Sequence, residues 1–457
     1  MSSTAAPPRV SRVLIANRGE IALRVVRACR TVGVGAVVAT STADLDSLAA
    51  RSADRALCIG PPSAAASYLK VAAVVTAAQM GGCDAIHPGY GFLAESPELA
   101  DACVEEGLTF VGPSARLLRL FGSKVSAREA ARAAGVPLSA GTEELADAQA
   151  ARAAADELGY PVLIKPVRGG GGKGMRVVSA AEEMEAAFAL ARQEAIAAFG
   201  DSALYLERWV ARARHVEVQV AGDGTGTVLH FGDRDCSVQR RQQKLVEEAP
   251  APALPAALQD AIRESAVALC SSVRYNSVGT VEFLVDVDRG DYFFLEVNPR
   301  IQVEHGVTEL VTGIDLVALQ LRLAAGEPLP WTQDEVRIEG AAIECRVNAE
   351  DPDLGFRPSP GRITGWHPPT GAGVRVDSHC EQGYLVPPFY DSLIAKVMAV
   401  AADREAAITR LEGALAEFRC EGIATTTTLV GRILAEPDFH AVRHHTKWLD
   451  TLPQPKE

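Results

Sequence analysis

The sequence predicts a mixed α/β and α+β protein that begins with a doubly wound parallel sheet. The first observation is a β-α-β pattern, with an apolar run at 13–16, an amphipathic segment to Thr31 and a second apolar run at 36–39. The second is a change of character near Gly122-Ser123-Lys124, and the third is the alternation of short strands with Pro and Gly turns after residue 346. We therefore expect an N-terminal doubly wound sheet, a central domain of a different kind and a C-terminal mixed α+β domain.

The N-terminal elements can be placed in order. Arg18-Gly19-Glu20 begins the first helix and Gly33 ends it, because glycine readily adopts the left-handed conformation that closes a helix. Further short strands are expected at 56–59, 85–86 and 109–111. No Gly-x-Gly-x-x-Gly turn follows the first strand, so a dinucleotide is not indicated.

Composition excludes several classes of function. The chain has 457 residues, 48% of them hydrophobic and 23% charged, which is ample for a large core. A net charge of -13 argues against general nucleic-acid or anionic-membrane binding, so an anionic substrate must meet locally clustered Lys and Arg. The nine cysteines are scattered without metal-binding spacing, and no apolar run approaches the length of a membrane span. We expect a cytoplasmic protein with reduced thiols.

A run of glycines at 169–174 suggests a phosphate-binding lid. Its spacing formally fits the dinucleotide motif, but the residues that follow, 175–178, continue as a strand, so no helix N-terminus awaits a pyrophosphate. A mobile glycine loop between two strands, with Lys165 and Lys173 beside it, suits a flap that closes over nucleotide phosphates. The alternative is a flexible hairpin tip.

The segments between residue 204 and Lys244 give a weaker indication of function. Residues 204–210 and 215–220 are expected as strands, and His215 lies at the start of the second. The following stretch becomes strongly basic towards Lys244, which indicates either a local anion site or a solvated run. Glu247 and Glu248 follow and could neutralise it.

A hairpin at 280–298 carries the strongest chemical signal. Two apolar strands, 280–286 and 292–295, are joined by a polar, Gly-containing turn. Alternation along a strand places Glu296 and Asn298 on one face, and antiparallel pairing can bring Glu282 to that face. Two carboxylates and an amide oxygen suit a hard cation such as Mg²⁺. Arg300, Gln302 and Glu304 follow at once, so a guanidinium can hold an oxyanion beside a carboxylate base. The alternative is an exposed hairpin with a salt-bridged end.

The remainder is expected to contain a helix over 306–326, a strand over 340–346 with Glu344 and Arg346 on one face, a strand at 391–396 and a helix at about 404–418. His87 is expected to be structural, Cys236 a small packing residue, and His444 and His445 surface residues.

Taken together, these motifs resemble the biotin carboxylase component of biotin-dependent carboxylases, within the ATP-grasp superfamily. The resemblance runs in order from about residue 10 to about 450. It is carried by the segments 15–22, 85–92, 169–175, 214–219, 234–237, 248–252, 296–305 and 344–350. Each motif alone is weak, but their joint agreement is highly specific. The resemblance implies a central ATP-grasp domain with a glycine-rich lid and domain boundaries of 1–122, 123–340 (lid about 140–212) and 341–457.

The resemblance also implies a role for each residue in ATP-dependent carboxylation of biotin by bicarbonate through carboxyphosphate. The base would be Glu304, and Arg346 would stabilise the enolate-like ureido group of biotin. Magnesium or manganese would bind Glu282, Glu296 and Asn298. Bicarbonate would bind Lys244, Arg300, Gln302 and Val303. ATP would be held by Lys124, Lys165, Gly171, Gly172, Glu207, Val210 and His215, with Gln239 in the same cofactor-binding group.

The chain departs from the family pattern at three positions. Gln242 stands where a His is frequent, Arg168 where a small residue is common before the glycine run, and Gly306 where Pro is usual. None of them removes a residue that the chemistry requires.

The family's biotin-bearing Met-Lys-Met sequence does not occur. We therefore expect the biotin to arrive on a separate carrier protein, or on a part not included in this chain. We also expect a carboxyltransferase subunit in trans, and the chain itself to form a homodimer or larger complex. Two rival interpretations are an ATP-grasp ligase that joins a carboxylate to an amine or thiol, and an inactive nucleotide-binding subunit.

Overall fold

The computed structural model describes residues 10–167 and 174–452. The chain divides into two compact units. The large unit contains residues 1–136, 214–283 and 295–457, and the small unit contains residues 137–213 and 284–294. The sequence-based boundaries at 122 and 340 stay a prediction.

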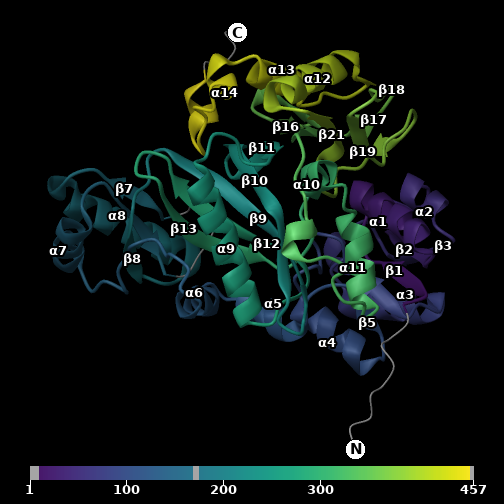
Figure 1. The fold of residues 1–457 in the computed structure, drawn as a ribbon, viewed down its shortest axis with the longest axis horizontal. Coiled ribbons are helices and arrows are strands. Elements are labelled where there is room, and N and C mark those ends of the chain that lie inside the picture. The colour runs from purple at the N-terminus through teal and green to yellow at the C-terminus, as the bar shows by residue number, and fades with distance from the viewer. Residues whose placement is uncertain (1–9, 168–173, 453–457) are drawn as a thin grey trace, which may run out of the picture. The chain divides into compact units, whose positions relative to one another are not determined.

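The large unit begins with the expected doubly wound sheet (Figure 1). Its five parallel strands have the order β3-β2-β1-β4-β5. The first helix ends at Gly33, whose φ of 73° is left-handed, as the sequence predicted. The elements are β1 (Arg12–Ile15), α1 (Gly19–Val32), β2 (Gly35–Ser41), α2 (Leu48–Ser52), β3 (Arg55–Gly60), α3 (Val71–Gly81), β4 (Ala85–His87), α4 (Pro97–Glu105), β5 (Thr109–Phe110), α5 (Ala115–Gly122) and α6 (Lys124–Ala133).

An eight-stranded sheet with the order β13-β12-β9-β10-β11-β14-β21-β19 follows. Every pairing from β9 through to β19 is antiparallel. The sheet runs without a break across the predicted boundary at 340, because β14 pairs directly with β11. Its strands are β9 (Ala213–Asp223), β10 (Val228–Arg240), β11 (Gln243–Ala249), β12 (Asn276–Asp286), β13 (Asp291–Asn298), β14 (Ala341–Asn348), β19 (Val374–Ser378) and β21 (Leu393–Ala401).

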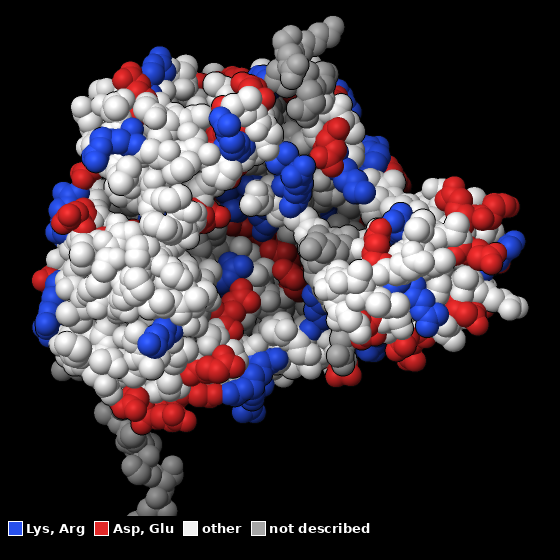
Figure 2. Space-filling model, turned by 180° about the vertical axis from the view of Figure 1, so that it is seen from behind, with Lys and Arg blue, Asp and Glu red and all other residues white. Residues whose placement is uncertain are grey.

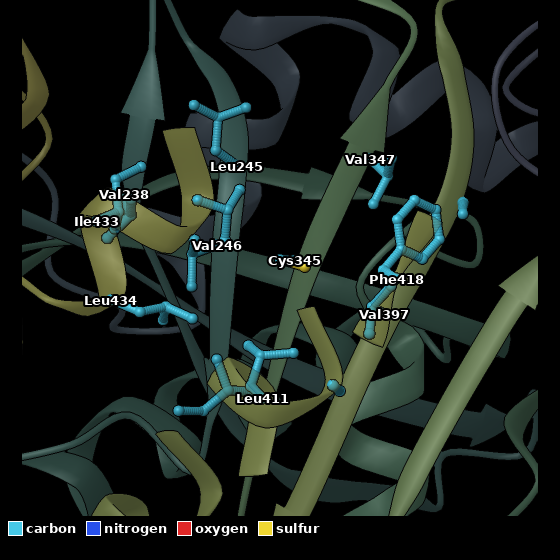
Figure 3. Close-up of a cluster of buried hydrophobic side chains, with 14 of the residues drawn as sticks. Val238, Leu245, Val246, Cys345, Val347, Val397, Leu411, Phe418, Ile433 and Leu434 are labelled. Carbon is cyan, nitrogen blue, oxygen red and sulfur yellow. The ribbon is translucent and has the colours of Figure 1, made fainter. Parts of the chain in front are cut away.

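The two faces of this sheet differ sharply around β14. Side chains alternate along a strand, so Cys345 and Val347 share one face while Glu344 and Arg346 share the other. The first face packs against α12 (Arg404–Glu417) and α13 (Thr427–Leu434), and Figure 3 shows Leu411 of α12 in this apolar cluster. The other face contacts α10 (His305–Thr312). Glu344 and Arg346 thus lie on one face, as expected.

The other elements of the C-terminal part are short. They are β15 (Glu350–Asp351), β16 (Arg357–Pro358), β17 (Gly361–Arg362), β18 (Gly365–His367), β20 (Leu385–Val386), β22 (Arg419–Glu421) and α14 (Pro437–His440). Two longer helices, α9 (Ala256–Ser272) and α11 (Leu316–Ala324), precede them in the chain.

The small unit holds a three-stranded sheet with the order β7-β6-β8. Its strands are β6 (Val162–Pro166), β7 (Arg176–Val178) and β8 (Leu204–Arg208), and its helices are α7 (Ala148–Leu158) and α8 (Met184–Phe199). Apolar residues of both helices and all three strands form its core. The glycine run therefore lies between two strands, β6 and β7, as the sequence predicted, although residues 168–173 are outside the described part.

Two sequence-based expectations are wrong. The helix expected over 306–326 is two helices, α10 and α11, because Gly313 adopts a left-handed φ of 70° and Asp315 caps the next helix by accepting a hydrogen bond from the Ala318 amide. His444 is buried at 1% exposure, with Nε2 3.6 Å from a carboxylate oxygen of both Asp235 and Glu248. It was expected at the surface because a His pair near a chain end carries no periodic signal of burial.

The distribution of charged side chains on the surface agrees with the acidic composition of the chain. On the face shown in Figure 2, acidic and basic side chains are intermixed and no broad basic area is seen. Among the described residues, no helix has the length and apolarity that crossing a bilayer requires.

Candidate active site

The turn after β13 delivers the predicted reactive residues. Asn298 ends the strand, and Glu304 occupies the N-cap position of α10. Glu304 is fully buried, whereas the Arg300 side chain keeps 20% exposure. A strand end followed by a tight turn and a helix start thus brings a buried carboxylate and a partly exposed guanidinium close together.

Lys244 of β11 is the centre of the charge cluster. Its Nζ lies 2.7 Å from Glu217, 3.2 Å from Glu282 and 2.5 Å from Glu304. The basic stretch therefore contains an ordered cation, which favours the anion-site interpretation over a solvated run at this residue. Burial disfavours the charged amine, but the surrounding acids outweigh it and raise the pKa of Lys244 well above its usual value. Lys244 is therefore permanently charged.

Glu282, Asn298 and Gln302 form one hydrogen-bonded group. One Glu282 oxygen accepts a hydrogen bond from the Asn298 amide at 2.9 Å and from the Gln302 amide at 3.0 Å. The other lies 3.0 Å from His215 Nε2. Burial opposes ionisation of Glu282, but Lys244 and His215 hold its pKa well below the usual range, so it is a carboxylate.

Glu296 completes the predicted cation-binding set. Glu296 is an exposed residue, but partial desolvation of its carboxyl, and then repulsion by Glu282, raise its pKa above the usual value, while His215 and then Lys124 lower it. Two carboxylates that repel each other beside an amide oxygen are a donor set that a hard divalent cation would stabilise. The residues present therefore fit magnesium or manganese.

Arg300 contacts two members of this group. Its Nε is 2.5 Å from Glu95, and a terminal nitrogen donates to the Asn298 side-chain oxygen at 2.9 Å. The other terminal nitrogen is 3.3 Å from the Gln302 oxygen. Because Glu95 is 46% exposed, that pairing is open to competition by an anion in solvent.

Glu304 is held between two cations. Besides Lys244, it accepts a hydrogen bond from Arg346 at 3.0 Å through its second oxygen. Burial would raise the pKa of Glu304, but Lys244, Arg346 and Arg234 together hold it well below the usual range. Arg346 in turn donates from Nε to Glu247 at 2.6 Å.

Sequence reasoning missed the residues that support this group. Arg234 is completely buried and donates to Glu217 at 2.6 Å, Gln219 at 2.7 Å and Thr308 at 2.9 Å. It therefore fixes Glu217, which fixes Lys244. A polar residue at every second position of an otherwise apolar strand, as in 215–219, is the signal that could have revealed Glu217.

Cys236 belongs beside this group as well. It is fully buried with Sγ 3.9 Å from Glu304, and burial raises the pKa of its thiol well above 9. It is thus an un-ionised thiol, in agreement with its expected packing role.

Three models of protein families match the chain. The biotin carboxylase N-terminal domain matches residues 9–118, the ATP-binding domain of the carbamoyl-phosphate synthase L chain matches residues 123–332, and the biotin carboxylase C-terminal domain matches residues 344–451. The chain belongs to the biotin carboxylase family.

Individual members of the biotin carboxylase family confirm this assignment. A biotin carboxylase of Pseudomonas aeruginosa is 50% identical over 94% of this chain and 96% of its own. The structure of a Campylobacter jejuni biotin carboxylase with a β,γ-ATP ligand has a TM-score of 0.90 and 43% identity, covering 97% of this chain and 99% of that one. The biotin carboxylase domain of Hydrogenobacter thermophilus 2-oxoglutarate carboxylase, described as a dimer with MgADP and bicarbonate, has a TM-score of 0.88 and 42% identity, with 97% coverage of each chain. The predicted family, fold class and ATP-dependent ligase class are confirmed.

The remaining predicted residues of this biotin carboxylase are distributed as follows. Gln239 pairs with Lys244 in the β10–β11 register, and the Val303 carbonyl accepts a hydrogen bond from Lys396 at 2.6 Å. In the small unit, Lys165 and Glu207 form an ion pair at 2.8 Å, and Val210 is buried. Gly171 and Gly172 lie outside the described residues.

The structure describes the surroundings of two of the three residues that depart from the family pattern. Gln242 sits in the β10–β11 turn with φ of 68°, where a side chain is strained. Gly306 lies against Met398, and a Cβ added there would be 2.3 Å from its sulfur. A larger residue at 306 would therefore need a smaller one at 398. The third departure, Arg168, is outside the described part.

Proposed function

We propose that this chain carries out the ATP- and bicarbonate-dependent carboxylation of biotin on a separate carrier protein. The observation that supports it best is the cluster of Glu304 with Lys244 and Arg346, next to the Glu282 group. A buried carboxylate between two cations can accept a proton from an anion that the cations attract. The family assignment supplies the reaction, and the resemblance to the family supplies the role of each residue, which the geometry of the cluster supports.

Glu304 is the proposed general base. Its depressed pKa keeps it ionised at every physiological pH, so it is always ready to accept a proton. The cost is weak basicity. Because Lys244 is shared among three carboxylates, a bicarbonate bound beside Arg300 and Lys244 would draw positive charge away from Glu304 and make it a stronger base.

Deprotonated bicarbonate would then attack the γ-phosphorus of ATP. An oxygen–phosphorus bond forms, the bond to the ADP oxygen breaks, and carboxyphosphate and ADP result. Arg300, Gln302 and Val303 would hold the attacking oxyanion. Glu282, Glu296 and Asn298 would bind magnesium or manganese, which neutralises phosphate charge when present. We also propose that Lys124, Lys165, Glu207, Val210, His215 and the two glycines contribute to ATP binding.

Arg346 has the geometry for a second role. Its Nε is occupied by Glu247, while its terminal nitrogen reaches the base and its side chain keeps 16% exposure. A guanidinium that is fixed on one side and accessible on the other can stabilise the enolate-like oxygen of the biotin ureido ring during carboxyl transfer.

The test is ADP formation by the purified chain with MgATP and free biotin, with and without bicarbonate. We expect turnover that requires bicarbonate and rises with biotin, and carboxybiotin as a product. Turnover with an amine or thiol acceptor and no bicarbonate would contradict the proposal in favour of another ATP-grasp ligase.

The partners follow from the same reaction. A biotin carboxyl carrier protein and a carboxyltransferase subunit in trans, a homodimer or larger assembly, and a cytoplasmic location complete the proposal. Co-purification of a biotinylated polypeptide with this chain is the direct measurement; recovery of the active chain with no biotinylated partner would contradict the carrier part.

A further inference from the structure

Two buried carboxyl groups face each other behind Arg346. Glu247 of β11 is the cross-strand partner of Glu344 of β14, and both side chains are completely buried. Directly opposed residues of antiparallel strands have Cβ atoms about 5 Å apart and point to the same face. Two ionised carboxylates on such opposed and completely buried residues repel strongly, so this pair is more stable with a proton on one member.

The hydrogen bonds of the two carboxyl groups also indicate that the pair holds a proton. One Glu247 oxygen accepts from Arg346, but the other has no partner, and neither oxygen of Glu344 has one among the described residues. Buried polar atoms are nearly always satisfied. One added proton turns an acceptor oxygen of this pair into a donor, so a single proton reduces the deficit and removes one negative charge.

The surroundings do not supply enough positive charge for two anions. Arg346 is already shared with Glu304, and Lys396 donates to the Val303 carbonyl and lies 3.3 Å from Glu20. Burial raises the pKa of Glu344 well above its usual value and that of Glu247 to about 7. The charged or titratable groups on the packed elements are Lys244 on β11, Cys236 on β10, Arg346 on β14, Lys396 on β21, Asp377 on β19, Glu20 on α1, and Glu304 and His305 at the start of α10.

We propose that Glu247 and Glu344 form a carboxyl pair that holds one proton and positions Arg346 between Glu247 and Glu304. The proposal rests on the proposed function. With one proton the pair carries a single negative charge, which matches the single Arg346 Nε that contacts it. Loss of that proton adds a second negative charge beside Arg346, draws the guanidinium away from Glu304 and biotin, and lowers the rate of carboxyl transfer.

The first experiment detects the proton itself and needs no activity. The infrared C=O stretch of a protonated carboxylic acid is recorded on the full chain at about pH 6 and about pH 9. We expect Glu344→Gln to remove one such band from the spectrum at the lower pH and Glu344→Asp, which keeps an acid there, to retain it. Identical protonated-acid bands in wild type and Glu344→Gln would overturn the proposal. Should the Gln variant not fold, the wild-type band must still weaken between the two pH values; an unchanged band overturns the proposal equally.

The second experiment measures the pH dependence of kcat for bicarbonate-dependent carboxylation of biotin. We expect the alkaline fall of wild type to move upward by about one pH unit in Glu344→Gln, since Gln cannot ionise, and to remain in place in Glu344→Asp. Glu339→Gln, an exposed acid just before β14, is the matched control that should not move it. An alkaline limb that stays in place in Glu344→Gln would overturn the positioning role. Absence of any carboxylation in wild type would instead overturn the proposed function and leave the infrared result to decide the pair.

Discussion

The two faces of the sheet at β11, β14 and β21 are held together by different forces. On one face Val246, Cys345 and Val397 pack against C-terminal helices (Figure 3). On the other face the alternate residues are Glu247, Arg346 and Lys396, each with oppositely charged neighbours. On the apolar face the loss of one side chain costs the contacts that it made, because dispersion and burial are summed over many contacts. On the charged face each cation serves two or three acids, so the loss of one cation leaves several acids less compensated.

The largest effect is expected for a substitution of the proposed general base. Glu304→Gln keeps the shape but cannot accept a proton, so bicarbonate-dependent ATP cleavage should fall by about 10²–10⁴-fold, the usual contribution of a general base. Calorimetry should still detect nucleotide binding. A rate within about threefold of wild type would remove Glu304 from the base role.

A large loss of stability is expected when a buried cation that holds the charged cluster in place is removed. Arg234→Met removes one of the two cations that contact the buried Glu217 carboxylate, leaving only Lys244, and should cost about 3–5 kcal/mol of unfolding free energy. Leu411→Ala on the apolar face should cost about 2–5 kcal/mol through a cavity.

A second substitution distinguishes the two variants. Adding Glu217→Gln to Arg234→Met removes the buried charge that lost a partner and should restore part of the stability, whereas adding it to Leu411→Ala should restore none. Denaturant unfolding of the single and double variants measures both. The same change in stability in the two backgrounds would contradict the distinction between the faces.

A smaller effect is expected where α10 meets the charged face. Gly306→Ala places a methyl group 2.3 Å from the Met398 sulfur, which should cost about 1–3 kcal/mol by overpacking. Met398→Ala combined with it should recover more stability than the sum of the single changes predicts. Thermal unfolding of the four proteins completes the cycle, and simple additivity would show that the two side chains do not compete for space.

The smallest effect belongs to an ion pair at the surface. Arg443 and Asp438 are each about half exposed, with the side chains at 55% and 47%. Asp438→Asn should change the unfolding free energy by no more than about 1 kcal/mol and have less effect in high salt. A loss comparable to that of Arg234→Met would mean that charge alone, and not its burial, sets the cost.

The sequence indicated members of the proposed site more directly than the residues that support them. Lys244, Glu282 and Glu304 could be found because they lie in motifs of contiguous residues. Glu247 and Glu344 could not be paired in advance, because only the β11–β14 register sets them opposite each other. A cross-strand neighbour nearly one hundred residues away leaves no local pattern.

Predictions from local sequence patterns were wrong where contacts between distant parts of the chain determine burial or a helix end. His444 looked like a surface residue, yet the fold carries it between Asp235 and Glu248, where it stacks on Phe439. Gly313 lies within an apolar periodic segment that predicts a single helix, although its left-handed conformation divides the helix there. The N-terminal β-α-β unit was predictable because strand, helix and glycine stop are adjacent in the chain.

The unbroken pairing of β11 with β14 has a consequence for protein engineering. Cutting or swapping the chain at 340, where a sequence comparison would place a junction, would strip three strands from a sheet and leave β11 with a row of bare peptide groups open to self-association. In a chimera that takes its C-terminal part from another family member, each β11–β14 cross-strand pair would combine one residue from each parent. Such hybrids should be chosen by compatibility at the β11–β14 seam.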